Sequence, residues 1–524
     1  MQNFEEHSTP ASRLTLSDFL STASAKYGDR PFITFEKSQH EPVTITFDRF
    51  VMQARNMALW LRAEGVEIGT PILLHVDNSI EAFIAWFAIV LSGAICVSTN
   101  TKLTLSELTE HFDVIEPKFA ITQPQYLSVV QDSLKPSRPI YLVDNETGEL
   151  HPKLNSAMHV DELGSEMPEA IAACLFTSGT TSRPKAVGLT QANLCIGAYS
   201  AAENIGLVET DTNLVHLPFF HINALVYSML ASMAAGCKIV LTPKFSASTF
   251  WELSKKHRCT WAAMIAFTIK ALKARPIPSE HHYRCWGWGL TDPQVDTHFG
   301  IRTISWYGMT ETISHPIIGS LDSLKNIAGA MGFEAPGYRI DLVGADGLNV
   351  GDNMVGEIRI RGTRGLNLFH SYLNDDSATA AVFDDQGRFK TGDLALRTAT
   401  GAFVYHGRIK DVIRVGAESV VPLEVESSLR KIAWIDDVAV VGLPDDLYGE
   451  VPVAFIMTSG ERNDTQSDIR DIGIILAKSL APHKHPRHFY FVRSLPRSML
   501  EKVNKAALRA EASRLHSTAT TEVL

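Results

Sequence analysis

The 524-residue sequence lacks the features of a membrane protein, a disulfide-stabilised protein or a typical zinc protein. Its most apolar stretch, residues 82–97, is interrupted at Ser92 and Gly93, so it is too short to span a bilayer and instead predicts a buried helix, a turn and a strand. The six cysteines are widely separated and form no C-x-x-C pair. The first residues include Glu5 and Glu6 but no apolar core, so we expect no secretory signal. We therefore expect a cytoplasmic protein that is not integral to a membrane.

Positive charge is also scarce, because 48 Lys and Arg residues face 58 Asp and Glu residues and the formal charge is −10 at pH 7. This balance argues against a nucleic-acid partner. The exception is the segment 487–509, in which Glu501 is the single acid among several basic residues. The segment is either a solvated basic helix face or a local field for polyanions such as a triphosphate or the phosphates of CoA.

The chain is longer than one compact core, so we expect at least two domains. Short apolar runs alternate with amphipathic stretches up to about residue 408, which indicates an α/β arrangement. A new pattern of two helices and three strands follows, which indicates a compact α+β unit. We predict a large N-terminal domain over residues 1–408 and a small C-terminal domain over residues 409–524. The expected strands are 72–76, 140–143, 214–217, 238–241, 301–306, 355–361, 402–405, 438–441, 453–457 and 489–492, and the expected helices are 50–63, 249–257, 423–431 and 469–480.

One segment, Phe-Thr-Ser-Gly-Thr-Thr-Ser-Arg-Pro-Lys over residues 176–185, combines five hydroxyls, a glycine and a lysine after an apolar strand. Backbone N–H and side-chain O–H groups of such a turn can surround polyphosphate oxygens, and a lysine adds a positive charge. The spacing is not that of the Walker A loop, and an ordinary Ser/Thr-rich loop is the alternative. The candidate phosphate ligands are Thr177, Ser178, Gly179, Thr180, Thr181 and Lys185.

The segment resembles the phosphate loop of the adenylate-forming superfamily, which includes acyl-CoA ligases, luciferases and peptide-synthetase adenylation domains. Four later segments follow in the family's order and are similar to its motifs: Trp-Tyr-Gly-Met-Thr-Glu-Thr at 306–312, Thr-Gly-Asp at 391–393, Gly-Arg-Ile-Lys-Asp at 407–411 and Pro-Arg-Ser-Met-Leu-Glu-Lys-Val at 496–503. The chain is thus identified as a member of the acyl-CoA synthetase branch. The resemblance implies a large multi-subdomain N-terminal domain and a small mobile α+β domain that swivels near Lys410.

The resemblance also implies roles for single residues in binding ATP, AMP and Mg²⁺. Tyr307 would stack on adenine beside Gly308 and Thr310, and the Glu311 carboxylate would hold Mg²⁺ against phosphate oxygens. Asp393 would accept hydrogen bonds from both ribose hydroxyls. The competing structural interpretations are a core tyrosine for Tyr307, a helix N-terminal acid for Glu311 and a plain turn residue for Asp393.

Further residues are implied in the two half-reactions. Arg408 would meet ribose or phosphate, and Lys502 matches the adenylating lysine that bridges the attacking carboxylate and the α-phosphate. Gly416 occupies a segment that lies along the pantetheine tunnel of CoA. His221 matches an aromatic or histidine position that gates the acyl site. A solvated helix lysine and a satisfied core histidine are the alternatives for Lys502 and His221.

The acyl pocket is expected to be apolar. Trp288 and Gly289 lie near the family's small-residue segment, and Phe220, His221 and Met309 complete the predicted pocket. No aspartate for an α-ammonium group follows Asp211 in this region, which argues against an amino acid. We predict a hydrophobic acid, bulky or polycyclic acids included.

Four departures from the family pattern bear on adenylation. Ser182, Ala186 and Ala417 replace glycines, which restricts the backbone beside phosphate or CoA. Glu501 replaces the glycine before Lys502 and places a negative charge beside the incoming triphosphate, where one charge pair at ~4 Å is worth about 4 kcal/mol before screening. The hypothesis is that adenylation is weak or lost, whereas thioester formation from a supplied acyl-adenylate survives.

The sequence therefore predicts an AMP-forming acyl-CoA ligase that uses ATP, Mg²⁺ and CoA on a small-molecule carboxylic acid. Three alternatives stay open: an adenylation enzyme that loads a carrier protein, a non-catalytic adenylate-binding protein and an oxidative luciferase. A homodimer also stays open.

Overall fold

The structure is a computed structural model that describes residues 14–37, 40–134, 138–143, 167–177, 183–320, 327–416, 418–458, 460, 465–497 and 503–521. It divides into two compact units. Unit 1 contains Met1–Ile340 and Ile360–Phe389, and unit 2 contains Asp341–Arg359 and Lys390–Leu524. Among the described helices, none is both long enough and apolar enough to cross a membrane.

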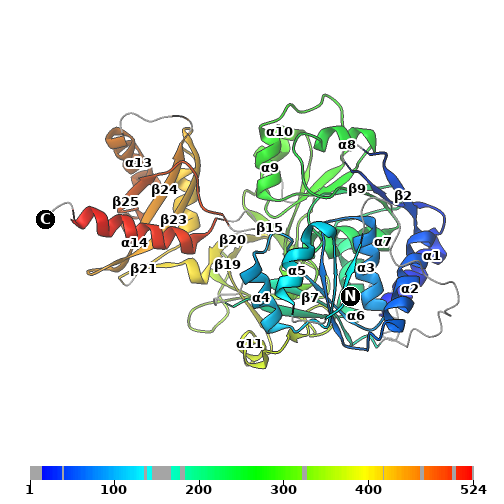
Figure 1. The fold of residues 1–524 in the computed structure, drawn as a ribbon. Coiled ribbons are helices and arrows are strands. Elements are labelled where there is room, and N and C mark those ends of the chain that lie inside the picture. Colours follow the sequence, from blue (N-terminus) through cyan, green and yellow to red (C-terminus); the bar gives the residue numbers. More distant parts are fainter. Residues whose placement is uncertain are drawn as a thin grey trace. The chain divides into compact units, whose positions relative to one another are not determined.

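The first sheet of unit 1 is built on parallel strands (Figure 1). Adjacent strands from β13 to β1 run parallel, so their carboxyl ends lie at one edge, and antiparallel partners flank them at both sides. Strands covered on both faces must be apolar throughout, and most residues of these strands are buried. In spatial order the strands are β15 (Ala330–Glu334), β14 (Ile317–Ile318), β13 (Thr303–Tyr307), β12 (Cys285–Trp288), β11 (Trp261–Ala263), β9 (Thr212–Val215), β10 (Lys238–Leu241), β1 (Pro31–Phe35) and β2 (Val43–Thr46).

One face of this sheet packs on three short helices. Leu214 and Trp286 of the sheet join Phe250 and Phe299 of the helices in one buried cluster. The other face packs on a π-helix, η4 (Asn223–Leu230), which contacts β9 and β11. The three helices are α8 (Phe250–Lys256), α9 (Ala266–Lys273) and α10 (Pro293–Phe299).

The second sheet of unit 1 carries the segment that precedes the candidate phosphate loop. Its central strands are parallel, whereas β8 and β18 add antiparallel at one edge. The spatial order is β18 (Ser371–Tyr372), β8 (Lys185–Thr190), β7 (Ile171–Thr177), β4 (Ile95–Ser98), β3 (Pro71–His75), β5 (Phe119–Thr122) and β6 (Ile140–Leu142).

The apolar stretch 82–97 forms a buried helix, a turn and a strand, as predicted. Every residue of α3 (Ile80–Leu91) is buried, Ser92 and Gly93 form the turn, and β4 follows. The Ser79 side chain caps the helix by accepting a hydrogen bond from the Ala82 N–H. The other helices of unit 1 are α1 (Leu16–Tyr27), α2 (Phe47–Ala63), α4 (Leu105–Val114), α5 (Leu127–Ser133), α6 (Gln191–Asn204), α7 (Ala231–Ala235) and α11 (Asp376–Ala381), with 3₁₀ turns η2 (Pro124–Tyr126) and η5 (Thr310–Thr312).

Unit 2 contains a row of four hydrogen-bonded strands and, later in the chain, a separate sheet. The row is β16 (Arg339–Val343), β17 (Val355–Arg361), β19 (Phe389–Arg397) and β20 (Phe403–Arg408), and the sheet is β22 (Glu418–Val420), β21 (Ile413–Val415), β24 (Gly449–Thr458) and β23 (Ile435–Asp445), with β25 (His488–Phe491) parallel to β24. The helices are α12 (Pro422–Leu429), α13 (Thr465–Ser479) and α14 (Lys505–Thr521), with turns η6 (Ile409–Asp411) and η7 (Pro482–Lys484).

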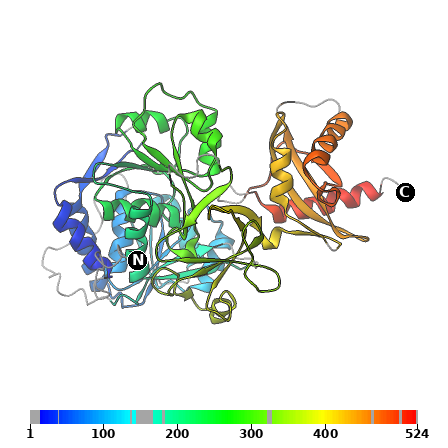
Figure 2. The ribbon, with the colours of Figure 1, turned by 180° about the vertical axis from the view of Figure 1, so that it is seen from behind.

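The two long strands of unit 2 bury side chains on both faces. Val440 and Ile456 enter a cluster with α12 and α13, whereas Val441 and Phe455 enter a second cluster with α14. Figure 1 shows α14 across one face of the sheet, and Figure 2 shows the helices of the opposite face. Because successive residues of a strand point to opposite faces, both faces need apolar residues and the run from Val438 to Leu443 is buried throughout.

Candidate active site

The first candidate cluster of unit 1 lies where β13 ends. Ligand sites of open α/β sheets lie beyond the carboxyl ends of their strands, and the segment Gly308–Thr312 follows β13 there. Gly308 has no room for a side chain, because an added Cβ would lie 2.6 Å from the Tyr227 hydroxyl and 2.8 Å from the Ser314 carbonyl oxygen. The Met309 N–H donates to Thr312 Oγ1 at 3.0 Å and thereby holds the turn.

Glu311 is buried within this turn, with 4% of its surface exposed. The Tyr372 hydroxyl donates a hydrogen bond of 2.9 Å to Glu311 Oε1, and the Phe369 N–H donates to the Glu311 carbonyl at 2.8 Å. Burial, together with the Glu311 charge, raises the pKa of Tyr372, so the phenol stays protonated and remains a donor. The two bonds fix the backbone and the carboxylate of Glu311.

Lys185 joins the same cluster from β8. Its Nζ lies 4.5 Å from the centroid of the Tyr372 ring, in the geometry of a cation–π contact. Thr177 is the register partner of Lys185 across β7 and β8. Three strand ends of unit 1 thus bring together a carboxylate, a phenol and an ammonium group. The remaining loop candidates, Ser178, Gly179, Thr180 and Thr181, lie outside the described residues, as does Ser182.

The structure changes the interpretation of Ala186. The residue lies in β8 opposite Phe176, and its methyl group is buried in a cluster with Val97, Ile115 and Cys174. Its φ is not positive, so the replacement of a glycine imposes no left-handed strain here. Ala186 therefore gives no physical reason for slow adenylation. Glu501 and Ala417 lie outside the described residues.

The predicted acyl-site residues fall at the ends of β9, β12 and β13 in unit 1, of which β12 and β13 are adjacent. Phe220 and His221 follow β9, are half-buried and stack edge to face with ring centroids 4.5 Å apart. Trp288 ends β12 and packs against the cluster of α8 and α10, whereas Met309 follows β13. Tyr307 is 8% exposed, and Gly289 is open on its side-chain side.

A second candidate cluster lies in unit 2, on the paired strands β19 and β20. Asp393 is the register partner of Arg408, and the Arg408 Nε donates to Asp393 Oδ1 at 2.9 Å. The Tyr405 hydroxyl donates to the same oxygen at 3.4 Å, and burial followed by the Asp393 charge raises the pKa of Tyr405. Gly392 has a φ of +71°, which a side chain would strain, and its N–H donates to Glu357 Oε1 at 3.2 Å.

Two predicted residues of unit 2 lie in turns. Gly416 has a φ of +60°, and its N–H donates to the Tyr448 carbonyl at 2.7 Å. Lys410 is exposed in η6, and its carbonyl accepts a hydrogen bond of 3.3 Å from Arg509. Lys502 lies outside the described residues.

Two features near these clusters were not predicted. Tyr372 is the hydrogen-bond donor to Glu311, and Glu424 accepts from His406 at 2.7 Å while also bonding Lys484. The His406 bond, the Lys484 bond and their charges lower the pKa of Glu424 to about 2, despite its partial burial. Neither residue belongs to a recognised motif of the sequence, so only their positions in space reveal them.

The donor set fits a magnesium nucleotide. Mg²⁺ prefers oxygen ligands and is usually held by one or two carboxylates together with substrate phosphates. Within the part of the chain that the structure describes, no three His, Cys, Asp or Glu side chains cluster as a metal cage would. A single carboxylate such as that of Glu311 is what a site completed by phosphate oxygens requires. The fold and these clusters define an adenylate-forming enzyme.

Comparisons with known proteins give the family. The model for the AMP-binding enzyme matches residues 20–373, and the model for the AMP-binding enzyme C-terminal domain matches residues 424–502. The chain therefore belongs to the AMP-binding enzyme family. The predicted family, fold class and enzyme class, an AMP-forming acid–thiol ligase, are confirmed, as are its cofactors ATP or AMP, CoA and Mg²⁺.

The chain is similar to several CoA ligases over almost its whole length. Crotonobetaine/carnitine–CoA ligase of Proteus mirabilis is 28% identical over 504 residues, which cover 92% of this chain and 96% of that protein. Sulfoacetate–CoA ligase of Cupriavidus necator is 27% identical over 514 residues, with 94% and 97% covered. The structure of o-succinylbenzoate CoA synthetase from Bacillus subtilis with its acyl-adenylate has a TM-score of 0.82 at 26% identity, with 94% and 97% covered.

Proposed function

We propose that the protein converts a hydrophobic carboxylic acid, bulky acids included, into its CoA thioester through an acyl-adenylate. In the first step a carboxylate oxygen forms a bond to the α-phosphorus of ATP, and pyrophosphate leaves. In the second step the CoA sulfur attacks the acyl carbonyl, and AMP leaves. Both steps concentrate negative charge, so fixed positive charge and hydrogen-bond donors lower their barriers.

The cluster of Glu311, Tyr372 and Lys185 is the observation that best supports this proposal. Lys185 would attract phosphate oxygens, and Glu311 would hold Mg²⁺ in the orientation that the Tyr372 bond imposes. Mg²⁺, when bound, would neutralise charge on the phosphates and polarise them. In unit 2, Asp393 would accept the ribose hydroxyls, with Arg408 beside it for ribose or phosphate. Lys502 would bridge the attacking carboxylate and the α-phosphate.

The nature of the acid is the second part of the proposal. The relatives are named for acids as different as crotonobetaine, carnitine and sulfoacetate, so they do not define the acid. Trp288 and Phe220 offer half-buried aromatic surface at the strand ends, which favours an apolar acid. His221, stacked on Phe220, would gate this site.

The test is a coupled assay with ATP, Mg²⁺, CoA and a panel of aromatic, alicyclic and long-chain acids. We expect AMP and an acyl-CoA to form together with apolar acids and not with free amino acids. Transfer only to a phosphopantetheinyl protein would instead identify a carrier-loading enzyme. Tight binding of an acyl-sulfamate without turnover on any thiol would identify a non-catalytic binding protein, and light with a luciferin-like acid would identify a luciferase.

We further propose that Glu501 weakens the adenylation step, so that the enzyme works best on a supplied acyl-adenylate. Pyrophosphate exchange should be slow in the native protein and faster in Glu501→Gly, whereas Ala186→Gly should add nothing because its methyl group packs in the core. Vigorous exchange by the native protein with its own acid would eliminate this part. Thioester formation from synthetic acyl-adenylates should then exceed the rate from acid plus ATP.

The setting of the reaction completes the proposal. We place the enzyme in the cytoplasm, because all six cysteines are buried and none forms a disulfide, as is usual in a reducing compartment. A homodimer stays an option, and sedimentation analysis would test it. No nucleic acid or membrane enters the reaction.

A further inference from the structure

The region beneath the Gly308 turn contains a buried polar group without a bonding partner. His315 is 0% exposed, and neither of its ring nitrogens has a hydrogen-bond partner among the described residues. The hydroxyl of the preceding residue, Ser314, is likewise buried and unpaired within that part of the chain. A buried imidazole without a partner loses its bonds to water and gains nothing in return, so such a group calls for a ligand or an ordered water.

Aromatic rings hold this imidazole in place. Its ring centroid lies 4.0 Å from that of Tyr227 and 4.9 Å from that of Trp306. Tyr227 comes from the π-helix η4, and its hydroxyl donates to the Ser314 carbonyl at 3.2 Å. Trp306 lies directly over Gly287, where even a methyl group would collide with the indole. The histidine therefore has a fixed position.

This position is one layer beneath the candidate active site. An added Cβ at the half-buried Gly308 would touch the Tyr227 hydroxyl and the Ser314 carbonyl oxygen, so Tyr227 and the residue before His315 lie directly against the start of the turn that carries Glu311. The chain reaches this place through Ile313, whose φ of +61° is strained for a β-branched residue. Strained residues and π-helical turns both concentrate at functional sites.

We propose that His315, Tyr227 and Trp306 form the floor of the acyl pocket, and that His315 hydrogen-bonds an uncharged polar group, such as a hydroxyl, carbonyl or amide, on an otherwise apolar acid. This inference rests on the proposed ligase function and specifies its substrate class. The rings pack the apolar body of the acid, and the imidazole recognises one polar substituent.

The charge state of His315 restricts that substituent. Burial alone lowers the pKa of His315 to about 3, so the ring is neutral and offers one donor and one acceptor nitrogen. A second carboxylate would find no countercharge in such a neutral ring, and an anion buried without one is strongly disfavoured. An uncharged group that can donate or accept is the complementary partner.

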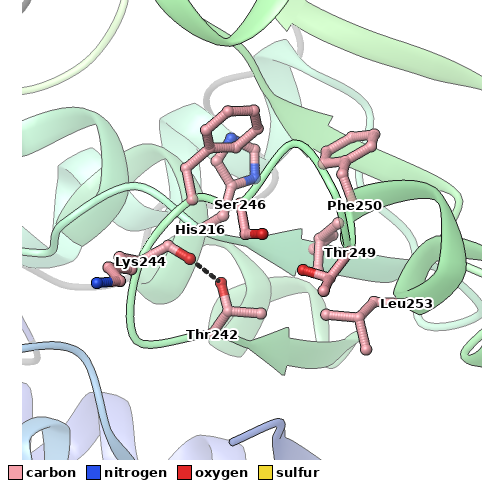
Figure 3. A pocket seen from close by; sticks show the side chains of 9 residues that line it. His216, Thr242, Lys244, Ser246, Thr249, Phe250 and Leu253 are labelled. Atoms are coloured by element: carbon pink, nitrogen blue, oxygen red, sulfur yellow. Dashed lines mark hydrogen bonds between the residues drawn. The ribbon is translucent and has the colours of Figure 1, made fainter. Parts of the chain in front are cut away.

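A second buried histidine provides the control. His216 is 3% exposed, and neither of its nitrogens is bonded in the described part of the chain, although burial lowers its pKa to only about 4. It differs from His315 in its place in the fold, because it lines a small, largely apolar pocket with Thr242, Phe250 and Leu253, which Figure 3 shows around it. His216 therefore controls for the loss of a buried imidazole outside the proposed floor.

The experiment measures the binding of paired acyl-sulfamoyl adenosines by calorimetry. Each pair consists of an apolar acid and the same acid with one hydroxyl or oxo group, in aromatic, alicyclic and aliphatic series. The native protein should bind the polar member of at least one pair about tenfold more tightly. His315→Leu should bring that ratio close to one, His315→Gln should keep part of it, and His216→Leu should leave it unchanged.

Three results would overturn the inference: ratios near one for every pair in the native protein, a ratio that survives in His315→Leu, or an equal loss in His216→Leu. His315→Gln retains hydrogen-bonding capacity and carries the test if the leucine variant does not fold. Thioester formation from the unsubstituted acyl-adenylates tests the ligase function separately. If the enzyme forms thioesters but the affinity ratio is close to one for every pair, only the inference about His315 is wrong. If no thioester forms but the affinity ratio depends on His315, only the proposed reaction is wrong.

Discussion

The carboxylates of the two candidate clusters are held by different chemistry. In unit 1 a neutral phenol donates to Glu311, and Lys185 contacts that phenol through its ring face. In unit 2 a guanidinium donates directly to Asp393. A carboxylate bonded by a neutral donor keeps most of its charge for a divalent cation, whereas one bonded by arginine is better suited to accept neutral hydroxyls. From this comparison we expect metal and phosphate at the unit 1 cluster and ribose at the unit 2 cluster.

The largest expected effect tests the unit 1 carboxylate. Glu311→Gln keeps the shape of the side chain but removes its charge, so adenylation should fall by about 1000-fold, the loss expected when a metal ion no longer stabilises transition-state charge. Pyrophosphate exchange at several Mg²⁺ concentrations measures it. Thioester formation from a supplied acyl-adenylate should fall much less. Glu334→Gln, which loses an ion pair with Arg339 in the same unit, serves as the control. Equal losses in both half-reactions would contradict the metal assignment.

The next effect tests the carboxylate of unit 2. Asp393→Asn should weaken AMP binding by about 50-fold, because hydrogen bonds to a charged acceptor are lost. Calorimetry with AMP, without Mg²⁺, measures it. Asp352→Asn is a matched control. Asp352, like Asp393, accepts a hydrogen bond from an arginine, here Arg397 at the end of β19 at 2.7 Å, but this pair is exposed at the surface. If AMP affinity fell equally in both variants, the ribose assignment would be wrong.

A smaller effect separates orientation from charge in unit 1. Tyr372→Phe keeps the ring beneath Lys185 and removes the bond to Glu311, so the Mg²⁺ concentration at half-maximal exchange should rise about tenfold. Direct titration with Mn²⁺ in the presence of ATP gives a readout besides activity. Tyr338→Phe removes a hydroxyl bond of 2.6 Å to the Thr312 carbonyl of the same turn and should leave the metal response unchanged. A metal response that shifts equally in both variants would reduce Tyr372 to a packing residue.

The smallest effect concerns stability in unit 2. Because the pKa of Glu424 is lowered to about 2 from 4.5, its stabilisation is complete above pH 4.5 and is lost as the pH falls through about 2. Glu424→Gln should lower the free energy of unfolding by about 1 kcal/mol at pH 7, after allowance for solvent screening of this partly exposed group, and the difference should shrink in acid. Urea titrations at several pH values measure it. Glu511→Gln, in an exposed pair with Arg514, should change little.

The sequence predicted the elements that local patterns determine. The expected strand 238–241 is β10 to the residue, and the helices at 50–63 and 423–431 differ from α2 and α12 by a few terminal residues. The expected strand 214–217 is β9 displaced by two residues, because the apolar run continues past the strand into the segment that leads to Phe220. End positions depend on pairing partners, which periodicity does not contain.

The residues of the candidate clusters could be predicted from the sequence where they belong to a recognisable motif. Glu311, Lys185, Asp393 and Arg408 lie in recognisable segments, and the structure brings them together in two clusters, although their roles stay predictions. Tyr372 was missed, because it bonds a residue 61 positions away and nothing local distinguishes it from other tyrosines. The strand environment of Ala186 could not be inferred either, since a glycine replacement in a loop and one in a strand look alike in sequence.

The burial of helix α3 has a consequence for folding during synthesis. Since all twelve of its residues are buried, it has no polar side that could face water while the rest of unit 1 is incomplete. Its contacts include α2 and the strands β3 and β4, and the Phe83 ring also packs against Phe219, which is encoded more than a hundred residues later. A fragment that ends soon after α3 would expose this apolar helix to water. We therefore expect such a truncated chain to aggregate or to be bound by chaperones instead of forming a smaller active enzyme.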